Sequence, residues 1–100
     1  MRVVSCNSFG PVAHLTVEER PTVPVGAGQV RIAVTAAGVN FVDGLFVQGL
    51  YQIKPPVPFV PGGEVAGVVT EVGEGVVTHT VGDRVFASTG LGGFASELVW

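Results

Sequence analysis

A glycine-rich run near the carboxyl end of the sequence has the spacing of a nucleotide-binding loop: Gly90-Leu91-Gly92-Gly93-Phe94-Ala95 fits G-x-G-x-x-A. Such a run holds a dinucleotide pyrophosphate when it follows a strand and opens a helix within a βαβ unit. Only a short β-like stretch follows it here, too short for a helix and a second strand. We therefore interpret the run as a glycine turn, and expect any dinucleotide phosphates to be held elsewhere.

Metal and nucleophile chemistry have little support in the sequence. The soft or imidazole ligands are Cys6, His14 and His79, and no two of them share a short ligand spacing. Zinc sites need several such ligands together, so we expect no metal held by this chain. A Gly-x-Ser-x-Gly elbow is absent, so hydrolase chemistry is also unsupported.

The elements that must position any site are mostly short strands. Alternating or continuous apolar runs bounded by Gly and Pro predict strands at Arg2 to Cys6, Val12 to Glu18, Val30 to Thr35, Glu64 to Val72, Val85 to Ser88 and Phe94 to Trp100. In the second of these, the pattern places Ala13, Leu15 and Val17 on one face and His14, Thr16 and Glu18 on the other.

One helix interrupts the strands. Helical spacing of apolar residues predicts it from Phe41 to Gln48, with Asn40 as its N-cap and Asp43 at a capping-box position. Gly49 ends this helix. The stretch from Tyr51 to Gly63 contains four prolines and is predicted to be an ordered irregular loop.

Length and composition limit the kinds of protein that this chain can be. One hundred residues make a single domain, and only 13% are charged against about 25% in ordinary domains, while 47% are apolar. The net charge of −3 and the scattered basic residues argue against nucleic acid, and frequent Gly and Pro exclude a transmembrane helix. A lone cysteine and no secretory signal lead us to expect a cytoplasmic protein. The apolar surplus predicts that a large face is an interface.

Four motifs in order resemble one known family. They are Gly38-Val39-Asn40-Phe41-Val42-Asp43, Gln48-Gly49-Leu50-Tyr51, the run from Pro61 to Val69, and Val81-Gly82-Asp83-Arg84-Val85. Together they resemble the amino-terminal, GroES-like half of the medium-chain dehydrogenase/reductase superfamily, and its zinc-independent quinone oxidoreductases above all. The resemblance covers residues 1–100 and implies a mainly β, partly open barrel with one short helix.

Departures from the zinc alcohol dehydrogenases indicate the chemistry. Their pattern has Cys where this chain has Asn40, and Gly-His-Glu where it has Gly62-Gly63-Glu64. The four-cysteine structural zinc lobe of that family is missing too. The resemblance therefore implies metal-free hydride transfer from NADPH to a quinone or enone, with the NADPH bound mainly by a Rossmann domain that this chain lacks. It also implies a homodimer for the full-length protein.

The resemblance also indicates candidate catalytic residues, each with a structural alternative. The Asn40 amide would bind the acceptor oxygen or the nicotinamide, or would only cap the helix. Asp43 would orient water or a ribose, or would be a structural carboxylate. The Tyr51 hydroxyl would donate to the developing enolate, or Tyr51 would be only an aromatic wall or an exposed loop residue. Phe46 is predicted to be helix core or substrate wall, and Glu64 a hydrogen-bonded structural carboxylate.

Two other functions compete with quinone reduction. An enoyl thioester reductase domain shares the N-F-x-D and G-x-Y features. A co-chaperonin-like binding module has this length, but the connection from Glu18 to Gln29 lacks an aliphatic tripeptide. Because the sequence stops within an apolar strand ending at Trp100, we expect a truncated chain. We also expect it to be inactive alone, since no fold for the dinucleotide phosphates is present.

Overall fold

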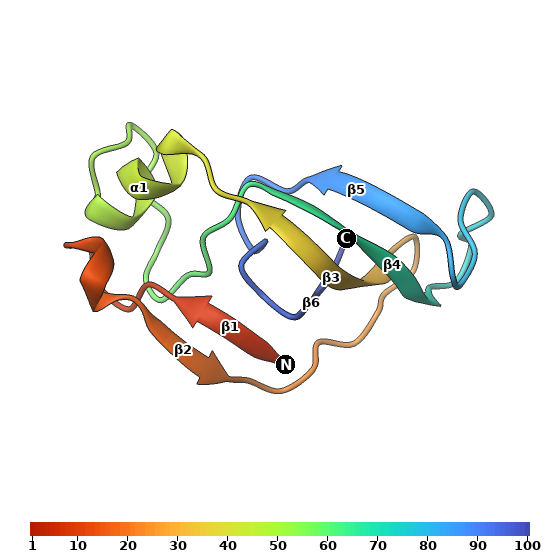
Figure 1. Ribbon diagram of the computed structural model, residues 1–100. Helices are drawn as coiled ribbons and strands as arrows, with labels where there is room; N and C mark the ends of the chain where they lie inside the picture. The colour runs from red at the N-terminus through yellow and green to blue at the C-terminus, as the bar shows by residue number, and fades with distance from the viewer.

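Two antiparallel sheets and one helix make up the computed structural model, which describes all 100 residues (Figure 1). The elements are β1 (Arg2–Ser5), the 3-10 helix η1 (Val12–His14), β2 (Thr16–Glu19), β3 (Val30–Gly38), α1 (Phe41–Gln48), β4 (Glu64–Val72), β5 (Arg84–Ser88) and β6 (Glu97–Val99). Strands β1 and β2 form one sheet, and the other has the order β5-β4-β3-β6. The mainly β fold with one short helix, and sheets that do not close, confirm the predicted architecture.

The long hairpin of β3 and β4 is the centre of the domain. Each strand has nine residues, and their antiparallel register pairs Ile32 with Val69 and Ala37 with Val65. Ile32, Val65 and Val69 are buried, so one face of this hairpin forms much of the core. Successive side chains of a strand point to opposite faces, so Val65 and Val69 face the core while Ala66 is exposed.

The loop after α1 is tied to the first strand. Cys6 and Phe59 form an isolated antiparallel bridge, with backbone hydrogen bonds of 2.8 and 3.1 Å. Cys6, Val47 and Phe59 then pack together as a small buried cluster. The Pro-rich stretch is thus ordered without regular secondary structure, as predicted. Burial of Cys6 in this cluster raises the pKa of its thiol.

The prediction of one continuous strand from Val12 to Glu18 is wrong. Val12–His14 forms a 3-10 turn after Pro11, and the strand begins only at Thr16. The predicted faces fail as well, because Val17 is 68% exposed while Glu18 is half-buried. The Glu18 carboxylate accepts hydrogen bonds from Asn7 and Thr16, and this polar cluster outweighs the apolar alternation. These bonds hold the pKa of Glu18 below its ordinary value.

The domain exposes much apolar surface. Its accessible area of 5941 Å² exceeds the roughly 5400 Å² expected for a compact protein of this mass. Val39, Phe41, Val77 and Phe86 are each more than 80% exposed. The expectation that a large face is an interface stays a prediction. No helix in the structure is long and apolar enough to cross a bilayer.

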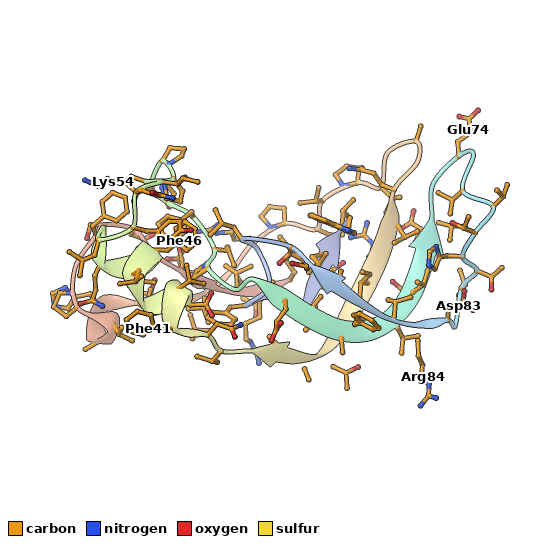
Figure 2. The ribbon with its side chains drawn as sticks, turned by 90° about the horizontal axis from the view of Figure 1, so that it is seen from above. Phe41, Phe46, Lys54, Glu74, Asp83 and Arg84 are labelled. Carbon is orange, nitrogen blue, oxygen red and sulfur yellow. The ribbon has the colours of Figure 1, made fainter.

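The hairpin between β4 and β5 carries charged residues at one end of the molecule, far from Lys54 (Figure 2). There the Asp83 carboxylate accepts the backbone N–H of Thr80 at 3.0 Å and its hydroxyl at 3.2 Å. Both bonds favour the ionised form, so the pKa of Asp83 lies below its ordinary value of 3.8.

Asp83 should therefore contribute to stability in a pH-dependent way. A lowered pKa in the folded state stabilises the fold above the ordinary pKa of 3.8, and that contribution disappears as the pH falls through the folded value. We expect Asp83→Asn to lower the urea midpoint at about pH 6, and expect its difference from wild type to shrink by about pH 2.5. Glu74→Gln, at the exposed neighbouring turn, is the control. A difference equal at both pH values would contradict the assignment.

Candidate functional site

The amino terminus of α1 brings two of the predicted site residues together. Asn40 is the N-cap and Asp43 the third helical residue, the positions of a capping box. The Asp43 carboxylate accepts the Asn40 backbone N–H at 2.7 Å, and the Asp43 N–H donates to the Asn40 backbone carbonyl at 3.0 Å. The capping box pairs the Asn40 side chain with the Asp43 backbone N–H, and the Asp43 carboxylate with the Asn40 backbone N–H. Asp43 thus fixes the Asn40 backbone, and the exposed Asn40 amide can still offer its NH₂ group to a ligand.

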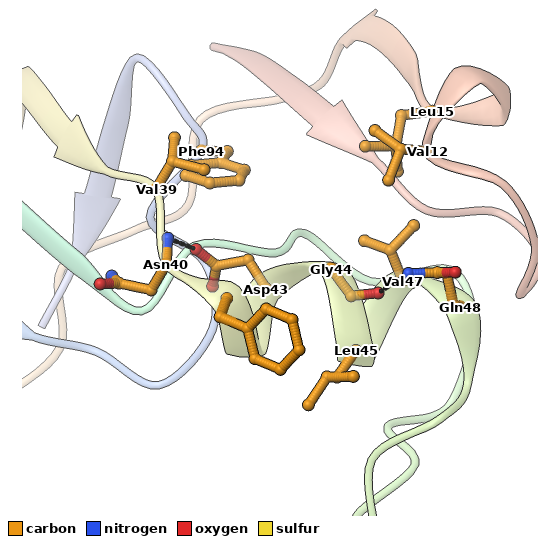
Figure 3. A pocket seen from close by; sticks show the side chains of 11 residues that line it. Val12, Leu15, Val39, Asn40, Asp43, Gly44, Leu45, Val47, Gln48 and Phe94 are labelled. Carbon is orange, nitrogen blue, oxygen red and sulfur yellow. Dashed lines mark hydrogen bonds between the residues drawn. The ribbon is translucent and has the colours of Figure 1, made fainter.

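An apolar groove of about 320 Å³ runs beside this helix (Figure 3). It is lined by Asn40 and Asp43 at one end, by Val39 and Phe94 above them, and by Val12 and Leu15 across from Val47. The exposed Asn40 and the buried Asp43 are its polar groups near the helix start. The groove therefore combines an apolar surface with hydrogen-bonding groups at one end, as small-molecule sites usually do.

Phe46 and Tyr51 lie outside the lining of this groove. Their rings pack on each other with centroids 4.8 Å apart. Phe46 also packs against the cluster of Cys6, Val47 and Phe59, which favours the interpretation of Phe46 as helix core. Tyr51 is half-exposed in the loop that follows Gly49. Of the four candidate residues, Asn40 and Asp43 therefore line the groove, whereas Phe46 and Tyr51 lie beside the carboxyl end of α1.

Glycines of the Pro61 to Val69 run are required by the backbone. Gly62 has φ of +109°, and a Cβ there would lie 2.6 Å from the Phe94 backbone nitrogen. Gly67 faces strand β3 so closely that a Cβ would overlap the carbonyl oxygen of Ala33. Glycine at these positions allows close backbone contacts. Gly62 packs against the groove-lining segment at Phe94, and Gly67 packs against β3.

Glu64 differs from its predicted role. Its side chain is exposed and lies over the backbone of Gly38, where any Cβ at Gly38 would overlap it. It has no hydrogen-bonded partner that would make it a buried structural carboxylate. Glu64 is the first residue of β4, so its side chain lies at the end of the strand and not in the core.

The remaining candidates for chemistry are separate from the groove. His14 lies in the exposed η1 turn, not on a strand face as predicted, because the strand starts two residues later. His79 is exposed beside the Thr78 hydroxyl, at 3.0 Å. No group of three His, Cys, Asp or Glu side chains could hold a metal ion. The run from Gly90 to Ala95 is a turn, as predicted, with φ of +74° at Gly90 and +91° at Gly92.

Sequence reasoning missed the apolar walls of the groove. Phe94 comes from a segment more than fifty residues after Asn40, and Val12 and Leu15 come from the misassigned strand. Val39 and Phe41, on either side of Asn40, line the groove and belong to a quoted motif, so the sequence did single them out. The others are placed by tertiary contacts, such as the hydrogen bond from the Phe94 N–H to the Pro61 carbonyl at 2.9 Å.

Comparison with known proteins places this fold in a family. Residues 26–99 match the family model described as the alcohol dehydrogenase GroES-like domain. The chain belongs to this family. A quinone oxidoreductase-like protein 2 homolog from Nematostella vectensis is 46% identical over 97 residues, which are 96% of this chain and 26% of that protein. The predicted resemblance to the medium-chain dehydrogenase/reductase superfamily is thereby confirmed.

Solved structures agree with this assignment of the GroES-like domain. The human synaptic vesicle membrane protein VAT-1 homolog-like protein is 32% identical with a TM-score of 0.95, over 100% of this chain and 32% of that one. The Escherichia coli quinone oxidoreductase complexed with NADPH is 29% identical with a TM-score of 0.92, over 99% of this chain and 30% of that one. The chain thus spans about a quarter to a third of its relatives. All its strand pairs are antiparallel, so it contains no Rossmann unit.

Proposed function

We propose that this GroES-like domain forms the acceptor side of a metal-free, NADPH-dependent reduction of a quinone or enone by the full-length protein. The observation that carries the proposal is the exposed Asn40 amide, which lies at the start of α1 and at one end of an apolar groove. Its position is that of a cysteine in the zinc alcohol dehydrogenases. A neutral amide there would provide a hydrogen bond instead of a metal.

The chemistry explains why such an amide is useful. Bound NADPH supplies a hydride to a conjugated carbonyl, and negative charge then develops on the carbonyl oxygen. An N–H donor already in place in an apolar groove stabilises that charge strongly, because little water competes with it. Asn40 would donate this hydrogen bond, and Asp43 would act as a positioning residue through its 2.7 Å bond to the Asn40 backbone.

In this proposal the chain contacts only the nicotinamide end of NADPH and does not bind its phosphates. The amino terminus of α1, where a phosphate would otherwise bind, already contains the buried carboxylate of Asp43. The glycine run from Gly90 to Ala95 opens no helix. The phosphates would therefore be bound by the Rossmann domain of the full-length protein, which we also propose to form the homodimer.

Tyr51 and Phe46 would belong to the same cleft in the full-length protein. Their packed rings offer an aromatic wall for a flat acceptor, and the Tyr51 hydroxyl is a possible second donor to the developing enolate. The co-chaperonin alternative is not favoured, because the connection from Glu18 to Gln29 lacks an aliphatic tripeptide. The connection before β3 is held by Arg31, which donates to the Val23 carbonyl at 2.6 Å.

Turnover by the full-length protein tests the proposal. We expect NADPH oxidation with a 1,4-quinone, no dependence on added zinc, and no zinc in the purified protein by mass spectrometry. The isolated 100-residue chain should give no steady oxidation under the same conditions. A preference for a 2-enoyl thioester would assign the domain to the enoyl reductases instead, and failure to reduce either acceptor would overturn both functions.

A further inference from the structure

One buried polar atom in the structure has no hydrogen-bonding partner. Asp43 is 3% exposed, and its Oδ1 atom makes no hydrogen bond, whereas Oδ2 accepts the Asn40 N–H. A buried carboxylate oxygen without a donor is costly, because it has lost the hydrogen bonds of water without replacement. A hydrogen-bond donor beside Oδ1 would remove this cost and stabilise the folded state.

Gly63, which has no side chain, lies beside this oxygen. A Cβ built on Gly63 would lie 3.9 Å from Asp43 Oδ1 and 3.6 Å from the carbonyl oxygen of Gly90, and apart from residues 62 and 64 no other heavy atom lies within 4 Å. Both neighbours are hydrogen-bond acceptors. The Gly90 carbonyl is held near Gly63, since the Thr89 and Gly90 N–H groups donate to the Gly63 carbonyl at 2.7 and 3.2 Å.

We propose that the space beside Gly63 binds one small hydrogen-bond donor, either water or ammonium, which donates to Asp43 Oδ1 and to the Gly90 carbonyl. Two acceptors match a molecule with at least two N–H or O–H bonds. An anion would be repelled by the carboxylate, and one carboxylate with one carbonyl provides too few ligands for a divalent metal. The bound donor would fix the start of α1 against the loop that follows β5, independently of any enzymatic activity.

Two substitutions at Gly63 test the site through the thermal unfolding of this chain. Gly63 is not among the glycines with positive φ, so alanine is sterically allowed and would ordinarily raise Tm by reducing the entropy of the unfolded chain. If the donor site exists, the methyl group displaces the donor, and Gly63→Ala lowers Tm by roughly 4 to 8 °C. Gly63→Ser supplies a hydroxyl donor instead, and should keep Tm within about 2 °C of wild type. A higher Tm for Gly63→Ala, or equal Tm values for the two variants, overturns the proposal.

A background lacking the carboxylate isolates the role of Oδ1. Asp43→Asn keeps an oxygen for the Asn40 N–H and removes the negative charge. In this background, the difference in Tm between Gly63→Ala and Gly63→Ser should shrink by at least half. An unchanged difference would show that Asp43 is not involved, and would also overturn the proposal.

Ammonium and water are then distinguished by salt. If ammonium is the ligand, replacing NaCl by NH₄Cl at equal ionic strength raises the Tm of the wild type but not of Gly63→Ser. Equal Tm values in the two salts assign the site to water, provided a high-resolution crystal structure shows a molecule within hydrogen-bond distance of Oδ1. A crystal structure with no molecule there overturns the proposal.

Discussion

Replacing Gly67 by alanine should destabilise the domain by about 3 kcal/mol. The new Cβ would overlap the Ala33 carbonyl oxygen and lie 2.8 Å from Ile32 Cγ2. The Ala33 oxygen belongs to the backbone of β3, between β4 and β6, and cannot move without breaking the ladders on both sides. In a domain of this size the loss corresponds to a fall in Tm of roughly 12 to 24 °C. Thermal unfolding followed by circular dichroism measures it.

Gly44→Ala is the matched control for this substitution. Gly44 lies within α1, and a Cβ there would have only Gln48 Nε2 nearby, at 3.8 Å. Alanine favours a helix over glycine by about 1 kcal/mol, so this variant should be more stable than wild type. If Gly67→Ala loses less than about 1 kcal/mol, the close approach of β4 to β3 is not as the structure describes it.

In the full-length protein, Asn40→Ala should reduce kcat/KM for the quinone by about 100-fold, as the removal of one preorganised donor does in other enzymes. Stability should fall by about 1 kcal/mol, because Asn40 is the N-cap of α1 within a capping box and the loss of a capping side chain usually costs about that much. Steady-state kinetics and urea unfolding of the same preparations separate the two effects.

Serine at position 40 provides the control for helix capping. Serine caps a helix about as well as asparagine but has no amide, so Asn40→Ser should be as stable as wild type and nearly as inactive as Asn40→Ala. If both variants keep normal kcat/KM, Asn40 does not bind the acceptor. If Asn40→Ala loses activity only in proportion to its stability, Asn40 is a capping residue.

Local sequence patterns correctly predicted the elements whose start and end are set by nearby residues. The bounds of α1 match the prediction, because Asn40, Asp43 and Gly49 supply start and stop signals within one short segment. β4 also matches from Glu64 to Val72, since it is bounded by a glycine pair and a glycine turn. The ordered motifs indicated the family before any fold was known, and the comparisons confirm it.

Local patterns failed where distant polar groups compete with apolar alternation. Val12 to Glu18 reads as a strand, yet hydrogen bonds from Asn7 and Thr16 draw Glu18 inward and leave Val17 exposed. The pattern of residues from Val12 to Glu18 does not show that Asn7, which lies earlier in the sequence, comes close to Glu18 in the fold. The strand therefore has its faces exchanged relative to the prediction.

The sequence by itself determined which residue types the chain offers for chemistry, the order of its short strands and its single helix. Only the tertiary structure decided how they meet. It placed Phe94 beside Asn40, paired Phe46 with Tyr51 away from the groove, and left Asp43 Oδ1 facing Gly63 without a donor. The reason is that strand and helix signals act over a few residues, whereas these contacts depend on the register of β3 with β4 and on the path of irregular loops, which periodicity does not encode.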